Sequence, residues 1–240
     1  MISVCIATYN GSEYIVDQIN SILPQLNELD EIIVSDDCST DNTIELVEGI
    51  KDSRIKIFKN TGDKGYSSNF ENALGLSVGE YIFLCDQDDI WLPNKVEVML
   101  DVLESGVDFA VHDAKVVNSN LEVLSESIFR DRKAKPGFIN QLIKIGYLGC
   151  CMAFNRKVLN YALPFPLNRT YVTHDSWLTL ISESYFKVRM INTPLILYRR
   201  HDNNVSLGGK PGDNKIFKKV MIRLYSVYHL MSRLNKKRIV

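Results

Sequence analysis

Short apolar runs alternate with longer amphipathic stretches along the first hundred residues, and this order constrains the fold most strongly. Runs rich in branched side chains at 2–8, 31–36, 54–59 and 80–86 predict strands. Apolar spacing predicts helices over 14–29 and over 66–77. Another helix is expected from Ser39 or Thr40, as its N-cap, to about residue 51. A further helix is expected to end at about 104 and to have Pro93 in its first turn. This repeated order predicts an α/β protein whose mostly parallel sheet carries helices on both faces.

The rhythm loosens after residue 107. Strands are expected at 108–117, 151–154, 188–192 and 195–200, and helices at 136–145, 157–162 and 175–186. The polar, Gly-rich stretch 201–214 predicts a loop, and 215–235 has apolar residues at helical spacing between basic ones. We therefore expect one domain over 1–209, followed by a basic, amphipathic helical appendage over 210–240. A chain of 240 residues with 45% hydrophobic content can bury one core of this size.

Charge is distributed unevenly along the chain. Residues 210–240 contain nine Lys or Arg and one acid, so this segment carries +8 and the rest −9 in a chain of net charge −1. An acidic body argues against a nucleic acid partner. The basic segment 215–238 has two interpretations, which are a helix on an anionic membrane surface and a helix packed on the domain with a solvated basic face.

The absence of targeting signals and the cysteine usage indicate the compartment in which the protein is expected. The sequence MISVCIATYN lacks the basic and apolar regions of a signal peptide, and no apolar run approaches the ~18 residues that cross a bilayer. The five cysteines are odd in number and contain no C-x-x-C, which indicates reduced thiols and neither a disulfide framework nor a zinc site. We expect a cytoplasmic protein, with the inner face of the cell membrane as an alternative location.

Polar and acidic residues follow three of the predicted strands. They are Thr8 to Gly11 at the end of the first strand, Asp36 to Ser39 at the end of the second, and Asp86 to Asp89 at the end of the fourth. Each group alone is explained by a turn or a helix cap. Ligands of open α/β sheets bind beyond the carboxyl ends of the strands, so three such groups at one edge predict a polar ligand site.

Asp86 and Asp88 stand two positions apart at the end of a buried strand. If the strand persists, both carboxylates point to the same side. Hard oxygen ligands at this spacing suit Mg²⁺ or Mn²⁺, which bridge readily to phosphate oxygens. The competing explanation is an acidic N-terminus for the helix that follows, which accounts for Asp89 better than for Asp86.

Five motifs occur in order: TYNG at 8–11, SDDCSTDNT at 35–43, NTGDKGYSSNFENAL at 60–74, GEYIFLCDQDDIW at 79–91 and THDSW at 173–177. Together they resemble a family 2 glycosyltransferase of the GT-A fold over about residues 1–205, and DQDDIW is similar to the rhamnosyltransferase-like subgroup. The Q-x-x-R-W motif of processive members is absent, because Trp91 and Trp177 are the only tryptophans and neither follows Arg. Transfer of a single sugar is therefore expected.

The resemblance implies a role for each matching position. Thr8 and Asn10 match the loop that holds the nucleotide, Asp37 the acid that binds the pyrimidine base, and Asn69 the nucleotide pocket. Asp86 and Asp88 match the D-x-D that contacts ribose and the metal–diphosphate, and His201 matches a later histidine that approaches the metal. Asp175 matches the general base.

The expected reaction is an inverting, metal-dependent transfer from a nucleoside diphosphate sugar to a glycan or lipid-linked glycan acceptor in cell-surface polysaccharide synthesis. A carboxylate such as Asp175 can take the proton of the attacking hydroxyl. His174 is the alternative base, but adjacent helical residues face different directions, so both cannot point at one hydroxyl. Donors could be dTDP-rhamnose or a UDP-hexose. A silent nucleotide-binding module and a peripheral membrane scaffold are the competing hypotheses.

Overall fold

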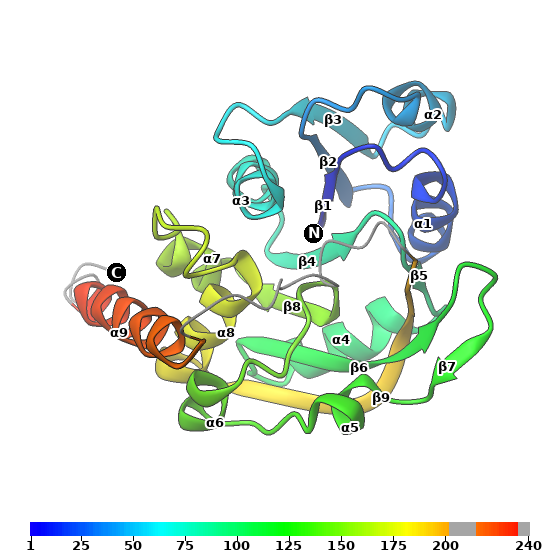
Figure 1. Cartoon of the computed structure of the whole chain (residues 1–240). Helices are drawn as coiled ribbons and strands as arrows, with labels where there is room; N and C mark the ends of the chain where they lie inside the picture. The colour runs from blue at the N-terminus through cyan, green and yellow to red at the C-terminus, as the bar shows by residue number, and fades with distance from the viewer. Residues whose placement is uncertain (202–214, 235–240) are drawn as a thin grey trace.

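The computed structural model describes residues 1–201 and 215–234, which are built around one curled sheet of nine strands (Figure 1). The strand order is β3-β2-β1-β4-β8-β6-β9-β5, and β7 pairs with β6. The strands are β1 (Ile2–Thr8), β2 (Glu31–Asp36), β3 (Ile55–Lys59), β4 (Tyr81–Asp86), β5 (Ile90–Trp91), β6 (Phe109–Val117), β7 (Val123–Ser125), β8 (Met152–Asn155) and β9 (Val188–Arg199).

The N-terminal half is the predicted parallel sheet. β1 pairs in parallel with β2 and β4, and β2 pairs in parallel with β3. The helices between them are α1 (Ile15–Ile22), α2 (Thr43–Gly49) and α3 (Tyr66–Leu76), and Figure 1 shows α1 and α3 on opposite sides of β1 and β2. The register sets Thr8 beside Asp36 and Ala7 beside Asp86. The three strands therefore end at one level, which brings the loops after them to one edge.

The C-terminal half makes the sheet mixed. β8 pairs antiparallel with both β4 and β6, whereas β9 runs parallel to β6 and antiparallel to β5. Around it lie α4 (Lys95–Glu104), α5 (Ile128–Arg132), α6 (Phe138–Ile143), α7 (Arg156–Ala162), α8 (His174–Tyr185) and the single turn η2 (Gly149–Cys151). The predicted mostly parallel α/β sheet with helices on both faces is confirmed.

Two predicted helices have different limits. The helix expected over 14–29 ends as α1 at Ile22 and continues as one 3-10 turn, Leu23–Gln25, because Pro24 has no N–H to donate to a further α-helical turn. The N-cap prediction at Ser39 or Thr40 is wrong, since α2 begins at Thr43. The hydroxyl of Ser39 donates to Oδ1 of Asp36 at 2.5 Å and does not cap the helix.

Two further expectations are also wrong. Pro93 does not lie in the first turn of a helix, because α4 begins at Lys95 after the N-cap Asn94. The strands expected at 188–192 and 195–200 form the single strand β9, whose register against β6 shifts on either side of Asp113. An irregular pairing lets one strand continue through Pro194, which lacks a ladder N–H.

The basic C-terminal segment forms α9 (Lys215–Arg233), which packs against α8 along one side. Leu230 is buried there, and the Tyr185 hydroxyl donates to its carbonyl oxygen at 2.7 Å. The predicted loop 201–214 and the domain boundary at 209/210 lie outside the described residues, apart from His201. Within the ranges 1–201 and 215–234, no helix has the length and apolar content that crossing a membrane requires.

Gly79 offers a test of how closely the start of β4 approaches β1. A Cβ atom on Gly79 would lie 2.6 Å from the Ser3 backbone nitrogen, and backbone cannot move aside cheaply. We expect Gly79→Ala to lower the free energy of unfolding by about 1–3 kcal/mol, as overpacking does. Denaturant titration measures this, with Gly75→Ala as control, because nothing lies within 4 Å of a Cβ there in α3. Equal stability of the two variants would contradict the prediction.

Candidate active site

The loop after β1 is tied to three other elements through Thr8. The Thr8 hydroxyl donates to Oε1 of Gln87 at 2.7 Å in the turn after β4. Its carbonyl oxygen accepts from Nδ2 of Asn69 in α3 at 3.0 Å and from the backbone N–H of Asp37 at 2.9 Å. The structure therefore brings Thr8, Asn69 and Asp37 together, as expected of residues that line one pocket.

Asp37 and Asn10 order the neighbouring loops. The carboxylate of Asp37 accepts from Nδ2 of Asn60 at 2.8 Å and from the N–H of Gly65 at 2.7 Å, so it holds the 60–65 loop over the end of β2. Asn10 has a φ of 48°, and its side-chain oxygen accepts from the Thr40 N–H at 2.8 Å. A carboxylate has about four acceptor positions, so Asp37 retains capacity for an N–H donor from a ligand.

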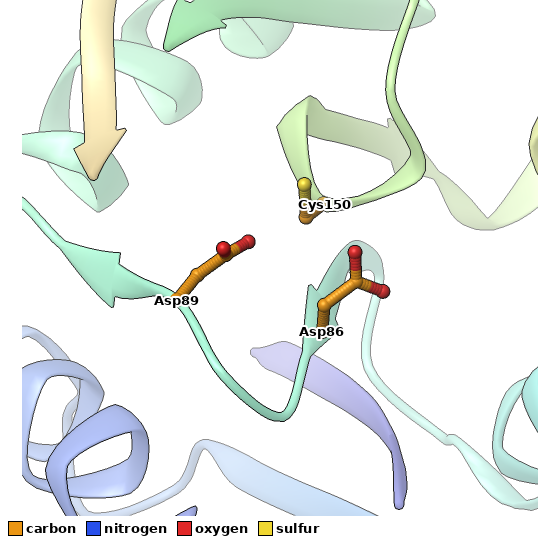
Figure 2. A group of neighbouring side chains, drawn as sticks. All are labelled: Asp86, Asp89 and Cys150. Carbon is orange, nitrogen blue, oxygen red and sulfur yellow. The ribbon is translucent and has the colours of Figure 1, made fainter. Parts of the chain in front are cut away.

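β4 ends in an acidic cluster that Figure 2 shows, formed by Asp86, Asp89 and Cys150. Their ligand atoms all lie within 4.8 Å of one another. Burial, followed by the charge of Asp88, raises the pKa of Asp86 to about 7 and the pKa of Asp89 well above its usual range. The strand ends at Asp86, so the condition for the Asp86 and Asp88 carboxylates to point to the same side of a strand is not met. Asp86 and Asp88 are nevertheless close enough to repel.

Asp88 contacts His201, the residue after YRR. Oδ2 of Asp88 lies 2.9 Å from Nε2 of His201, whose ring lies 4.8 Å from that of Tyr14. Arg199 supports the turn from β9, because its Nε donates to the Asp88 carbonyl at 2.9 Å and its N–H donates to Asp89 at 3.1 Å. The end of β9 thus positions the two residues that the sequence assigned to the metal.

Lys95 lies beneath the acidic cluster and is fully buried. Its Nζ donates to the Cys150 carbonyl at 2.8 Å and lies 3.9 Å from the centre of the Trp91 ring. Its charge lowers the pKa of Asp86, although less strongly than burial and Asp88 raise it. Lys95 is not among the site residues that the sequence motifs indicate. A signal was present, because Lys95 precedes the buried Met99 and Leu103 at spacings of four on α4.

Asp175 lies in the first turn of α8, far from the cluster in sequence but close in space. Oδ1 accepts from the Thr173 hydroxyl and from the Ser176 N–H, and Oδ2 makes no hydrogen bond with any described residue. Asp175 is near enough to raise the pKa of Asp86 through its charge. Oδ2 of Asp175 therefore has no competing hydrogen-bond partner among the described residues.

Gly149 connects α8 to the acidic cluster. A Cβ on Gly149 would lie 2.7 Å from Nε2 of His174 and 3.5 Å from Cβ of Asp175, while the next residue, Cys150, belongs to the cluster. His174 itself is buried, with its ring stacked on Phe70 at 4.1 Å. Burial lowers the pKa of His174. Asp175 is consequently the more accessible of the two candidate bases.

The side chains at the end of β4 offer ligand atoms that fit a hard divalent cation. Oδ2 of Asp89 is buried without a hydrogen-bond partner, and three carboxylates crowd one turn, so a cation has a place to bind. Carboxylates and one imidazole suit Mg²⁺ or Mn²⁺. The pKa of Cys150 is raised well above its usual value, first by its neighbour Cys151 and then by burial, so Cys150 stays a protonated thiol. A protonated thiol is a poor metal ligand.

Comparisons with known proteins identify the family to which the chain belongs. The family model described as Glycosyl transferase family 2 matches residues 3–162. A UDP-Glc:alpha-D-GlcNAc-diphosphoundecaprenol beta-1,3-glucosyltransferase of Escherichia coli, WfaP, is 30% identical over 209 residues, which cover 86% of this chain and 80% of the relative. The dTDP-rhamnosyl transferase RfbG of Shigella flexneri is 28% identical over 214 residues, covering 82% of this chain and 72% of RfbG.

Solved structures share the fold. TarS 1–349 of S. aureus, in complex with UDP-GlcNAc, aligns with a TM-score of 0.74 at 19% identity over 94% of this chain and 66% of that one. A glucosyl-3-phosphoglycerate synthase of Mycobacterium tuberculosis in complex with Mn²⁺ and UDP aligns with a TM-score of 0.59 at 18% identity, over 97% of this chain and 79% of that one. With the family model matching most of the sequence, this chain belongs to glycosyltransferase family 2 and is a glycosyltransferase.

Proposed function

We propose that this glycosyltransferase moves one sugar from a nucleoside diphosphate sugar to a glycan hydroxyl, with inversion, during synthesis of a cell-surface polysaccharide. The setting is supported by relatives whose names specify a diphosphoundecaprenol-linked acceptor or teichuronic acid biosynthesis. A glycan or lipid-linked glycan is the acceptor in this proposal.

The observation that carries the proposal is the approach of α8 to the end of β4. Asp175 lies close enough to Asp86 to raise its pKa, with Gly149 and Cys150 between the two carboxylates. A direct displacement needs a base on the acceptor side and a diphosphate site on the donor side, and no enzyme nucleophile. These two parts lie next to each other, although 88 residues separate Asp86 from Asp175.

On the donor side, the nucleotide would lie over Thr8, Asn10, Asp37 and Asn69, which the hydrogen bonds already group. The unused acceptor capacity of Asp37 suits the N3–H of uracil or thymine, so this contact fits UDP and dTDP equally. The ribose and diphosphate would follow toward Asp86 and Asp88 at the end of β4.

Asp88 and His201 would hold Mg²⁺ or Mn²⁺ in this proposal, with Asp86 beside them. When bound, such an ion stabilises the charge that develops on the leaving diphosphate. On the acceptor side, Oδ2 of Asp175 takes the proton of the attacking hydroxyl, while Thr173 and Ser176 fix the orientation of its carboxylate through Oδ1.

Thermal unfolding with nucleoside diphosphates tests the donor site. UDP, dTDP, GDP and CDP are each added with Mn²⁺ or with EDTA to the wild type and to Asp88→Ala. A ligand at about 100 times its Kd stabilises the native state by about 2.7 kcal/mol, which corresponds to a rise of several degrees in melting temperature. We expect one of the four diphosphates to give this rise, and only when both Mn²⁺ and the Asp88 side chain are present.

Asp101→Ala is the matched control, because Asp101 is an exposed acid on α4 and its loss should leave the shift unchanged. The base of the diphosphate that gives the rise identifies the donor as a UDP-sugar or a dTDP-sugar such as dTDP-rhamnose. Absence of a shift with all four nucleotides would contradict the proposal.

A further inference from the structure

The outer side of α9 is apolar, which is unusual for a helix that already packs on its domain. Its large exposed side chains are Phe217, Val220, Leu224, Tyr228 and Met231, each between 46% and 68% exposed. At 3.6 residues per turn they fall within an arc of about 80°. These five residues are called the α9 stripe below.

The α9 stripe lies opposite the buried side of the same helix. Ser226 and Leu230 are buried, and Tyr185 binds the carbonyl of Leu230. By the same helical geometry, the centre of this buried side lies about 140° from the centre of the stripe. The core therefore does not require the stripe to be apolar, and something outside the domain must account for it.

Two neighbouring segments flank the α9 stripe. On one edge Arg223 donates to the Ile143 carbonyl of α6, where Ile139 and Ile143 are exposed. On the other edge the Tyr225 hydroxyl accepts from the Asn168 N–H at 3.1 Å, next to Leu167, which is 87% exposed. The helix is thus fixed on both sides and presents its stripe in a defined orientation.

The charge of α9 indicates the kind of partner that the α9 stripe fits. The described part of α9 and the residue after it contain no acid, and the exposed Lys218 and Lys219 lie about 120° and 140° around the helix from the centre of the stripe. Residues 1–209 carry a net charge of −9, so an anionic surface attracts this helix more strongly than it attracts the rest of the chain. Two copies joined through this face would set like charges together, which is costly. An apolar stripe on a helix whose charged residues are all basic fits an anionic lipid surface.

We propose that α9 lies in the plane of an anionic membrane, with the α9 stripe between the acyl chains and the basic residues of the helix attracted by the headgroup charge. This surface goes beyond the proposed sugar transfer. Tyr185, which holds α9, follows Asp175 by ten residues on α8, or about 15 Å along the helix axis. Docking would hold the candidate base at a short, fixed distance from the lipid, within reach of a lipid-linked acceptor.

Co-sedimentation of the full chain with vesicles tests this proposal without any donor. Vesicles of phosphatidylcholine with phosphatidylglycerol are compared with phosphatidylcholine alone, at low and high salt. We expect binding to the anionic vesicles that weakens with salt. The triple variant Leu224→Ser, Tyr228→Ser, Met231→Ser should reduce binding at least tenfold.

The matched control is Leu29→Ser, Val78→Ser, Leu124→Ser, three exposed apolar residues elsewhere, and it should bind like the wild type. Wild-type protein that stays in the supernatant with anionic vesicles would overturn the proposal, as would equal binding of the two triple variants. A dimer that the stripe variant alone loses, seen by light scattering and without vesicle binding, would assign the stripe to a second copy. Neither outcome of the vesicle experiment changes the nucleotide-induced rise in melting temperature, which tests the donor site separately.

Discussion

Asp175→Asn is expected to lower the turnover number of sugar transfer by about 10²- to 10⁴-fold, the usual contribution of a positioned general base. The amide keeps an oxygen that can accept from the Thr173 hydroxyl and the Ser176 N–H, so the first turn of α8 should keep its geometry. It has no basic oxygen for the acceptor proton. Initial rates of nucleoside diphosphate release, with a glycan acceptor at saturation, measure the loss.

Two controls separate loss of the base from loss of structure. The variant should keep the nucleotide-induced rise in melting temperature, because Asp175 is not among the residues assigned to the nucleotide. Asp101→Asn removes a negative charge from an exposed position on α4 and should leave turnover unchanged. An Asp175→Asn enzyme with more than a tenth of the wild-type turnover would assign the proton transfer to another group.

Lys95→Met is expected to lower the free energy of unfolding by about 1–3 kcal/mol, the cost of leaving the buried Cys150 carbonyl without its hydrogen-bond donor. Met keeps much of the side-chain volume but has no charge and no donor for the Cys150 carbonyl. It leaves Asp86 and Asp89 without the cation that lies beneath them. Guanidinium unfolding followed by near-UV circular dichroism measures the change.

Lys64→Met is the comparison, since Lys64 is exposed in the loop before α3 and such surface changes stay within about 0.5 kcal/mol. A loss below about 1 kcal/mol for Lys95→Met would mean that the Cys150 carbonyl does not depend on Lys95 for its hydrogen-bond donor. That outcome would also remove the reason for a buried lysine at the start of α4.

Local pattern was enough to predict the parallel half of the fold. The strands at 2–8 and 31–36 appear with the predicted limits, because branched apolar runs bounded by polar loops have few other stable arrangements. The C-terminal half was harder. β5 and β7 contain two and three residues, too few for periodicity, and they exist only because β9 and β6 offer them hydrogen bonds.

In the candidate site, too, the sequence predicted some of the groupings and not others. Thr8, Asp37 and Asp86 lie at or directly after the ends of strands that must meet in a parallel sheet, so their grouping was predictable. Lys95 was overlooked because a lysine is normally exposed, and its burial is explained only by the acids and the Trp91 ring that surround it.

The sequence by itself determined the fold class, the acidic edge and the family resemblance, because these depend on periodicity and on the order of short motifs. Tertiary structure decided which distant groups meet. It placed Asp175 beside Asp86 and His201 beside Asp88. It also turned the apolar stripe of α9 outward, since periodicity gives a helix an apolar side but only packing against α8 determines which side is covered.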